Sequence, residues 1–162
     1  MLAAGHQVVA ANAALALATL GLVTPAEAVG LTAGALITAA GPFSPDADNR
    51  PPLGGFMRHR GALHWWGWPV LAALALAAVG TPALAYGPVI GWWSHVAADA
   101  LVGRGGQSIP RGVPLWPWGR TRVGTGWRVT GPFGGHSLVE LGLTGLFGVL
   151  VVVQAAALTL TL

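Results

Sequence analysis

Histidine and acidic side chains recur in this sequence at spacings that suit metal binding. His95 and Asp99 are four residues apart, and so are His136 and Glu140, so in a helix each pair lies on one face. An imidazole nitrogen and a carboxylate oxygen on one rigid element can hold a divalent cation together. One such pair is equally consistent with an ordinary polar contact, but two pairs in one chain favour a metal site.

The remaining candidate ligands lie in the first half of the chain. Asp46 and Asp48 could bridge two metals, or supply one ligand and one general base; the alternative is a solvated turn after Pro45. The chain has no cysteine, so any metal must take histidine and carboxylate ligands. All five histidines and four of the five acids gather toward one side of the predicted fold, which suggests one shared site: His6, Asp46, Asp48, His59, His64, His95, Asp99, His136 and Glu140.

Arginine supplies all eight basic side chains, and they fall within residues 42–61 and 103–135. Arg60, Arg120 and Arg122 could clamp an anionic group through two parallel hydrogen bonds, or could anchor loops to anionic headgroups. The basic residues do not line an amphipathic helix or groove. We therefore expect no nucleic acid partner.

The elements that must position these residues are apolar. The chain is 54% hydrophobic and 8% charged, with a mean hydropathy of +0.64, whereas a soluble domain has about a quarter charged residues. Apolar runs separated by Gly and Pro predict five helices, at about residues 7–23, 25–40, 62–86, 89–102 and 136–162. We predict one all-α domain over residues 1–162: a polytopic transmembrane helical bundle with two long loops rich in Arg, Trp, Pro and Gly on one face.

Five crossings would place residues 1–6, 42–61 and 103–135 on the same side of a bilayer. Since every arginine lies there, the positive-inside rule predicts a multi-pass inner (plasma) membrane protein whose site faces the cytoplasm. Residues 8–28 also imitate a signal peptide, but no basic residue precedes Glu27, which favours an uncleaved first helix.

Six short motifs follow one another along nearly the whole chain: Gly5-His6, Ser44 to Asp48, His59 to His64, Ser94 to Asp99, Gly112 to Pro117, and a late Glu140. Their order resembles the LexA-regulated, membrane-bound metal-dependent hydrolase family (YdjM-like). It is more distantly similar to zinc-dependent phospholipase C and related single-strand nucleases. These resemblances imply a metal centre, and its ligands by this comparison are His6, Asp46, His59 or His64, His95, Asp99, His136 and Glu140. The absence of a further histidine between the two spaced pairs favours one or two ions over three.

Together, the residues predict a metal-dependent hydrolase. A metal-activated water would attack a phosphoester at the membrane interface, with the bilayer and an amphiphilic phosphoester such as a lipid phosphate as partners. Zinc is the expected ion, and Asp48 the expected base. The alternative is a non-catalytic metal-binding membrane protein, either a transporter or a stress-related scaffold.

Overall fold

The first two helices form a hairpin whose turn the sequence predicts. The computed structural model describes residues 3–51, 60–101, 113–118, 121–123 and 138–160. Helix α1 spans Ala3–Thr19 and α2 spans Pro25–Ala39. Thr24 accepts a hydrogen bond from the Glu27 backbone N–H, and the Glu27 carboxylate accepts one from the Thr24 N–H. This reciprocal capping box, predicted from the sequence, is confirmed.

The third apolar run is interrupted where a single helix was expected. A 3₁₀ turn at Ala62–His64 precedes α3, which spans Gly67–Ala78. A glycine at position 80, with φ of +65°, then ends α3. A second 3₁₀ turn at Ala83–Tyr86 leads directly into α4, Gly87–Leu101.

The rest of the described chain contributes a short hairpin and the last helix. Strand β1 (Val113–Pro114) pairs antiparallel with β2 (Arg122–Val123), in a region expected to be loop only. Helix α5 spans Leu138–Thr159. The Trp65 indole N–H donates to the Leu115 carbonyl at 2.9 Å, which ties the hairpin to the segment just after His64.

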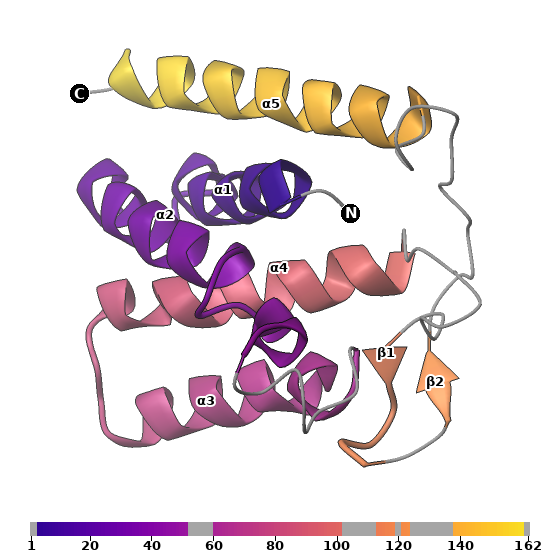
Figure 1. Ribbon diagram of the computed structural model, residues 1–162. Coiled ribbons are helices and arrows are strands. Elements are labelled where there is room, and N and C mark those ends of the chain that lie inside the picture. Colours follow the sequence, from indigo (N-terminus) through magenta and orange to yellow (C-terminus); the bar gives the residue numbers. More distant parts are fainter. Residues whose placement is uncertain (1–2, 52–59, 102–112, 119–120, 124–137, 161–162) are drawn as a thin grey trace.

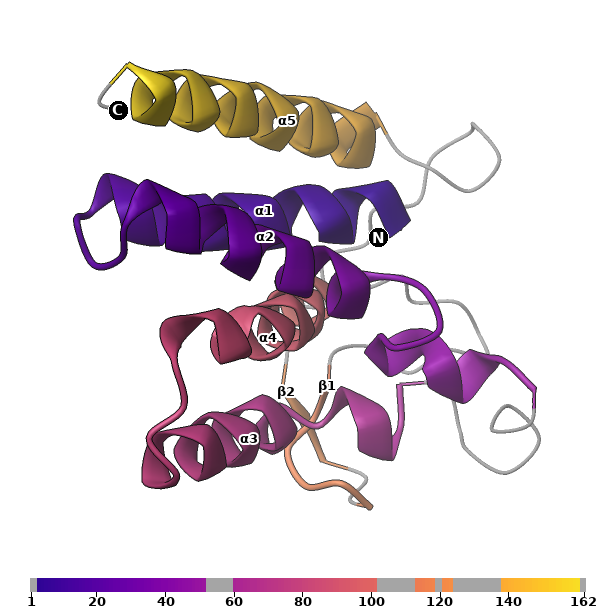
Figure 2. The same ribbon diagram turned by 90° about the vertical axis from the view of Figure 1, so that its left-hand side faces the viewer.

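The helices are stacked in layers (Figures 1 and 2). Helix α5 packs on α1; α1 and α2 lie side by side and both contact α4; and α3 packs on the other side of α4 together with the hairpin. The best-buried apolar side chains lie between α1, α2 and α4, with Ala10, Ala35 and Ala39 at the centre. Helix α4 is therefore the central element of the fold.

Two glycines let α4 approach α2 closely. A Cβ atom at Gly91 would overlap the Ala35 carbonyl and the Thr38 hydroxyl, and one at Gly87 would lie 2.7 Å from the Leu31 carbonyl oxygen. The hydroxyl of Thr38 also donates to the Pro88 carbonyl at 2.7 Å. This close contact brings the C-terminal end of α2 against the middle of α4.

The prediction of a polytopic transmembrane bundle is wrong. Within the described ranges, none of the helices combines the length and the hydropathy needed to cross a membrane. Helices α1 to α4 have 17, 15, 12 and 15 residues, so at about 1.5 Å per residue they reach about 18 to 26 Å against a hydrocarbon core of about 30 Å. Helix α5 is longer, with 22 residues, and no candidate membrane span is found among the residues of α5 that the structure describes. The predicted multi-pass inner-membrane localisation is wrong for the same reason.

Candidate metal centre

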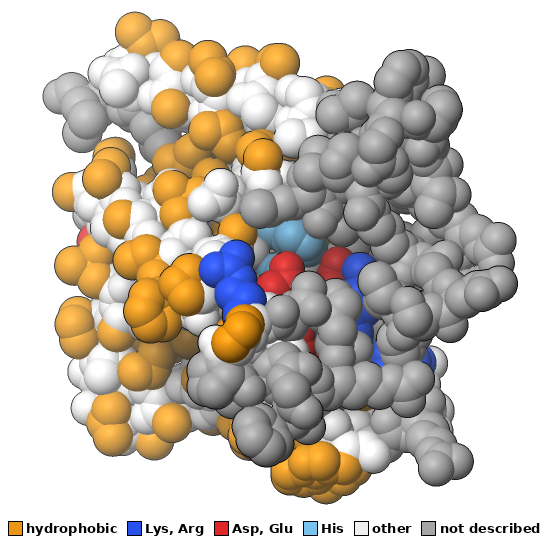
Figure 3. Space-filling view, in the orientation of Figure 1, with side chains coloured by type: hydrophobic (Ala, Val, Ile, Leu, Met, Phe, Trp, Pro, Cys, Tyr) orange, Lys and Arg blue, Asp and Glu red, His pale blue; other side chains and the backbone are white. Residues whose placement is uncertain are grey.

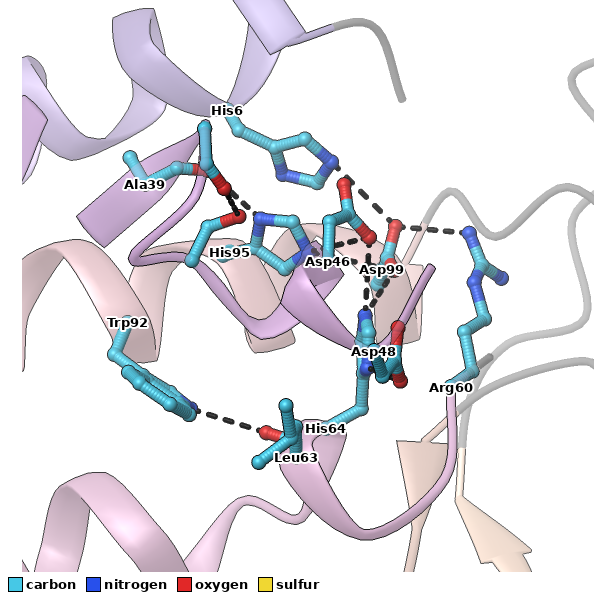
Figure 4. Close-up of polar contacts among 12 residues, drawn as sticks. His6, Ala39, Asp46, Asp48, Arg60, Leu63, His64, Trp92, His95 and Asp99 are labelled. Carbon is cyan, nitrogen blue, oxygen red and sulfur yellow. Dashed lines mark hydrogen bonds and ion pairs between the residues drawn. The ribbon is translucent and has the colours of Figure 1, made fainter. Parts of the chain in front are cut away.

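Four side chains from three segments converge beside α4. Asp46 lies in a 3₁₀ turn at Pro45–Asn49, His64 ends the 3₁₀ turn at Ala62–His64, and His95 and Asp99 lie on successive turns of α4. One ligand atom from each residue lies within 4.8 Å of the other three. Figure 4 shows the two imidazole rings and the two carboxylates pointing toward one another.

The separations within this group are those of atoms that share a cation. His64 Nε2 lies 3.4 Å from Asp46 Oδ1 and 3.5 Å from Asp99 Oδ2; His95 Nε2 lies 3.5 Å and 3.8 Å from the same two atoms. Such distances exceed a good N–H···O hydrogen bond, about 2.7 to 3.2 Å. Metal–ligand bonds of about 2.0 to 2.1 Å in a tetrahedron place neighbouring ligand atoms about 3.3 to 3.4 Å apart. The four residues could therefore hold one metal ion.

The backbone of α2 orients His95. His95 Nδ1 lies 2.8 Å from the Ala39 carbonyl oxygen, which can only accept, so Nδ1 carries the proton of this contact. Nε2 then offers its lone pair to the centre, and it makes no hydrogen bond within the described part of the chain. A metal-bound histidine is commonly oriented in this way. This contact depends on the close α2–α4 packing at Gly91.

A carboxylate orients His64 in the same manner. His64 Nδ1 lies 3.2 Å from Asp48 Oδ2, and both side chains are fully buried. The turn that carries His64 is fixed from α4, because the Trp92 indole N–H donates to the Leu63 carbonyl at 3.2 Å. Asp48 therefore lies behind the imidazole, on the side away from Asp46 and Asp99. This position suits orientation of His64 better than the general-base role predicted from the sequence.

Two further side chains contact Asp99. Arg60 Nη2 donates to Asp99 Oδ1 at 2.9 Å, and His6 Nε2 lies 3.6 Å from the same oxygen. The His6 ring stacks on His95 with ring centroids 3.8 Å apart and an angle of 14° between the planes. One oxygen of Asp99 thus faces Arg60 and His6, while the other faces the two histidine ligands.

The electrostatics of the metal-free centre follow from burial and from this crowding of carboxylates. Burial alone would lower the pKa of His64, but its contacts with the carboxylates of Asp46, Asp48 and Asp99 raise it to about 10. For Asp46 and Asp99, burial opposes ionisation, yet the imidazoles, and for Asp99 also Arg60, hold the pKa below its ordinary range. Burial, followed by the neighbouring His95 ring, lowers the pKa of His6 to about 3. Without a metal, therefore, His64 carries the cationic charge among ionised carboxylates.

The centre reaches the surface at one ligand. The Asp46 side chain is 37% exposed, whereas the side chains of His64, His95 and Asp99 are at most 3% exposed. On the face in Figure 3, acidic and histidine side chains appear together near the middle, next to basic ones, while hydrophobic side chains cover the helical part. A small molecule can therefore approach the four ligands from the side of Asp46.

The structure brings together His6, Asp46, His64, His95 and Asp99, with Asp48 and Arg60 in direct contact with them. Of the other predicted site residues, Arg122 lies on β2 and donates to the Arg60 carbonyl, and the remaining four are not tested. Of the two histidines in the segment before α3, the described one is His64; His59, Arg120 and His136 lie outside the described residues, and for Glu140 only the helical backbone is described. Sequence reasoning missed the Ala39 carbonyl, which orients His95, because every residue has a backbone carbonyl and the residue type gives no signal for this role.

No protein-family model, no curated protein and no solved structure matches this chain. We therefore interpret the centre from its own residues.

Proposed function

We propose that this protein is a metal-dependent hydrolase of phosphoesters. Asp46, His64, His95 and Asp99 would hold one divalent cation, zinc in the first instance. The observation that carries the proposal is the set of four imidazole–carboxylate separations of 3.4 to 3.8 Å around one point. Two nitrogen and two oxygen ligands without sulfur suit zinc.

The geometry supports a reactive centre over a purely structural one. A structural zinc site is a closed tetrahedron, whereas a catalytic site leaves a position for water. The exposed ligand Asp46 gives water a path to the ion. A zinc ion supplies the chemistry by lowering the pKa of a bound water from about 15.7 to about 7.

The protein's own residues would keep the ligands ready for this chemistry. The Asp48 carboxylate accepts a hydrogen bond from His64 Nδ1–H, and the Ala39 carbonyl accepts one from His95 Nδ1–H. Both histidines therefore present Nε2 to the ion. Arg60 offsets part of the negative charge at Asp99. The imidazoles are therefore oriented before the ion arrives, which lowers the entropic cost of binding it.

A neighbouring pocket supports a substrate with an apolar portion. Leu63, directly before the ligand His64, lines a pocket of about 400 Å³ together with Trp68, Ala72 and Trp92. Its lining is almost entirely apolar, as is common where a hydrocarbon group binds. We infer that the phosphoester is amphiphilic, with its phosphoryl group at the ion and its apolar part toward this pocket.

Metal analysis and a hydrolysis screen on the purified full-length chain would test the proposal. We expect one bound divalent ion per chain, and release of phosphate or alcohol from a panel of short-chain and long-chain phosphomonoesters and phosphodiesters. Chelation should abolish turnover, and zinc should restore it. Stoichiometric metal with no turnover on any substrate would instead identify a metal-binding protein without catalysis.

A further inference from the structure

The guanidinium of Arg60 has N–H donors at the metal centre that make no hydrogen bond within the described residues. Arg60 is 3% exposed, and its Nη2 donates to Asp99 Oδ1 at 2.9 Å. Its Nε and Nη1 are buried and have no hydrogen-bond partner within the described ranges. A buried donor without a partner costs about 1 to 3 kcal/mol, and more when it is charged. Two such nitrogens in one side chain therefore point to a ligand.

The shape of the guanidinium decides what that ligand is. Nη2 carries two hydrogens, one on the edge shared with Nε and one on the edge shared with Nη1. Asp99 accepts one of them. Whichever edge it uses, the other edge keeps two parallel N–H groups, one from Nη2 and one from an unpartnered nitrogen. Such a fork matches two oxygens of a carboxylate or a phosphoryl group.

The backbone holds Arg60 in a costly conformation. Its φ of +57° is the one positive value among the described non-glycine residues, and the left-handed region costs about 1 to 2 kcal/mol for such a residue. From strand β2, Arg122 Nη1 donates to the Arg60 carbonyl at 3.0 Å. Strain that is held in place by a separate segment commonly marks a functional position.

The position of the fork links it to the metal centre. The two oxygens of Asp99 divide their contacts: Oδ1 accepts from Arg60, while Oδ2 lies 3.5 Å from His64 Nε2 and 3.8 Å from His95 Nε2. In Figure 4 Asp99 lies between His95 and Arg60. The Asp99 carboxylate therefore separates the guanidinium from the ion, and a group bound at the ion lies close to Arg60.

We propose that the free edge of Arg60 binds the anionic oxygens of a phosphoryl group seated at the metal ion, and that Arg122 is a positioning residue that keeps Arg60 in place. The inference rests on the proposed function, because it assigns the residue that recognises the substrate's phosphoryl oxygens. The sequence offered three arginines for this task. The geometry gives Arg60 the contact and Arg122 a supporting role.

The test titrates inorganic phosphate into the zinc-loaded, full-length chain by calorimetry, after the metal content of each variant has been measured. Arg60→Lys retains the charge beside Asp99 but loses the fork, so we expect one bound metal and at least a tenfold weaker affinity for phosphate. Arg60→Gln should weaken phosphate binding further. Arg50→Gln removes the same charge from an exposed side chain directly after the turn that carries Asp46, and should change phosphate affinity less than threefold.

The positioning role has its own signature. Arg122 donates a hydrogen bond to the Arg60 carbonyl, and a lysine can donate in its place. Arg122→Gln should therefore weaken phosphate binding about three- to tenfold, and Arg122→Lys should restore most of it, whereas lysine at position 60 should not rescue. If Arg60→Lys kept phosphate affinity as well as Arg122→Lys does, the paired N–H groups of Arg60 would not be what binds phosphate.

Phosphate affinity within threefold of the wild type in metal-loaded Arg60→Lys would overturn the inference, as would the absence of phosphate binding to the metal-loaded wild type. Phosphoester turnover with an unchanged KM in Arg60→Lys would leave the proposed function in place and remove the role of Arg60. Phosphate binding through Arg60 without turnover of any phosphoester would keep the role of Arg60 in binding and remove the proposed hydrolase function.

Discussion

Replacing Asp99 with asparagine separates a metal ligand from a residue that only supports one. Asp99→Asn preserves the shape of the side chain while removing its negative charge, which serves both the ion and Arg60. Asp48→Asn weakens the support of His64. Glu27→Gln is the matched control, because Glu27 lies on an exposed turn and glutamine still fits a capping box.

The magnitudes follow from mass action. For the wild type at a metal concentration of 100 times Kd, binding adds about 2.7 kcal/mol, which raises Tm by about 5 to 11 °C for a chain of this size. Loss of a partner behind a ligand weakens metal binding by about 10- to 100-fold, so at the same metal concentration Asp48→Asn should keep a metal-induced rise of at most about 3 to 6 °C. Loss of a ligand should exceed 100-fold, which leaves Asp99→Asn a rise of at most about 2 °C.

The assay is thermal unfolding with and without zinc, with circular dichroism of each variant to establish folding. Asp99→Asn also leaves Arg60 buried without its carboxylate, which should lower the stability of the metal-free chain by about 3 to 5 kcal/mol. The difference between loaded and unloaded protein is therefore the informative quantity. A folded Asp99→Asn variant with the full wild-type rise would refute the assignment of Asp99 as a ligand.

Three further predictions test the packing, the pocket and the protonation of the centre. Gly91→Ala should lower the free energy of unfolding by about 1 to 3 kcal/mol through overlap with α2, and should weaken metal binding. Gly145→Ala, with no atom within 4 Å of its new Cβ, should gain about 0.5 to 1 kcal/mol in denaturant unfolding; equal effects would refute the α2–α4 argument. Ala72→Trp should raise KM for long-chain but not for short-chain phosphoesters, and Ala77→Trp, exposed on the same helix, should raise neither. Because the pKa of His64 is raised to about 10, its contribution to the stability of the metal-free chain is complete below the unfolded pKa of about 6.5 and is lost as the pH rises through about 10. In the same range of pH, zinc binding should release about one proton, because metal-bound His64 gives up the proton that it carries in the metal-free chain. Calorimetry in buffers of different ionisation enthalpy measures this release, and zinc binding without proton release would contradict the prediction.

Local signals in the sequence carried much of the helical pattern. The Thr24–Glu27 capping box fixed the start of α2, and the spacing of His95 and Asp99 placed both side chains on one face of α4. Each of these features depends on residues within one turn. The positions of Pro and Gly also marked most of the boundaries between helices.

Features that depend on distant residues were not accessible in the same way. Hydropathy sums apolar character over a segment, but a crossing requires an unbroken length, and the run over residues 62–86 is divided into α3 and two 3₁₀ turns. Large apolar side chains such as Leu20, Val79 and Val152 are exposed. High apolar content therefore does not predict the length of each helix, and the transmembrane prediction was wrong because it assumed unbroken helices.

The charges at the centre limit how many ions it can hold. Asp46, Asp48 and Asp99 bring three negative charges into contact with the two histidine ligands, and Arg60 returns one positive charge. One divalent cation balances the remaining two once His64 has given up its proton. A second divalent ion would leave an excess of two positive charges in a largely buried site, and would have to displace Arg60 from Asp99 Oδ1 or bring its own anions. Of the one or two ions expected from the sequence, the described residues therefore favour one.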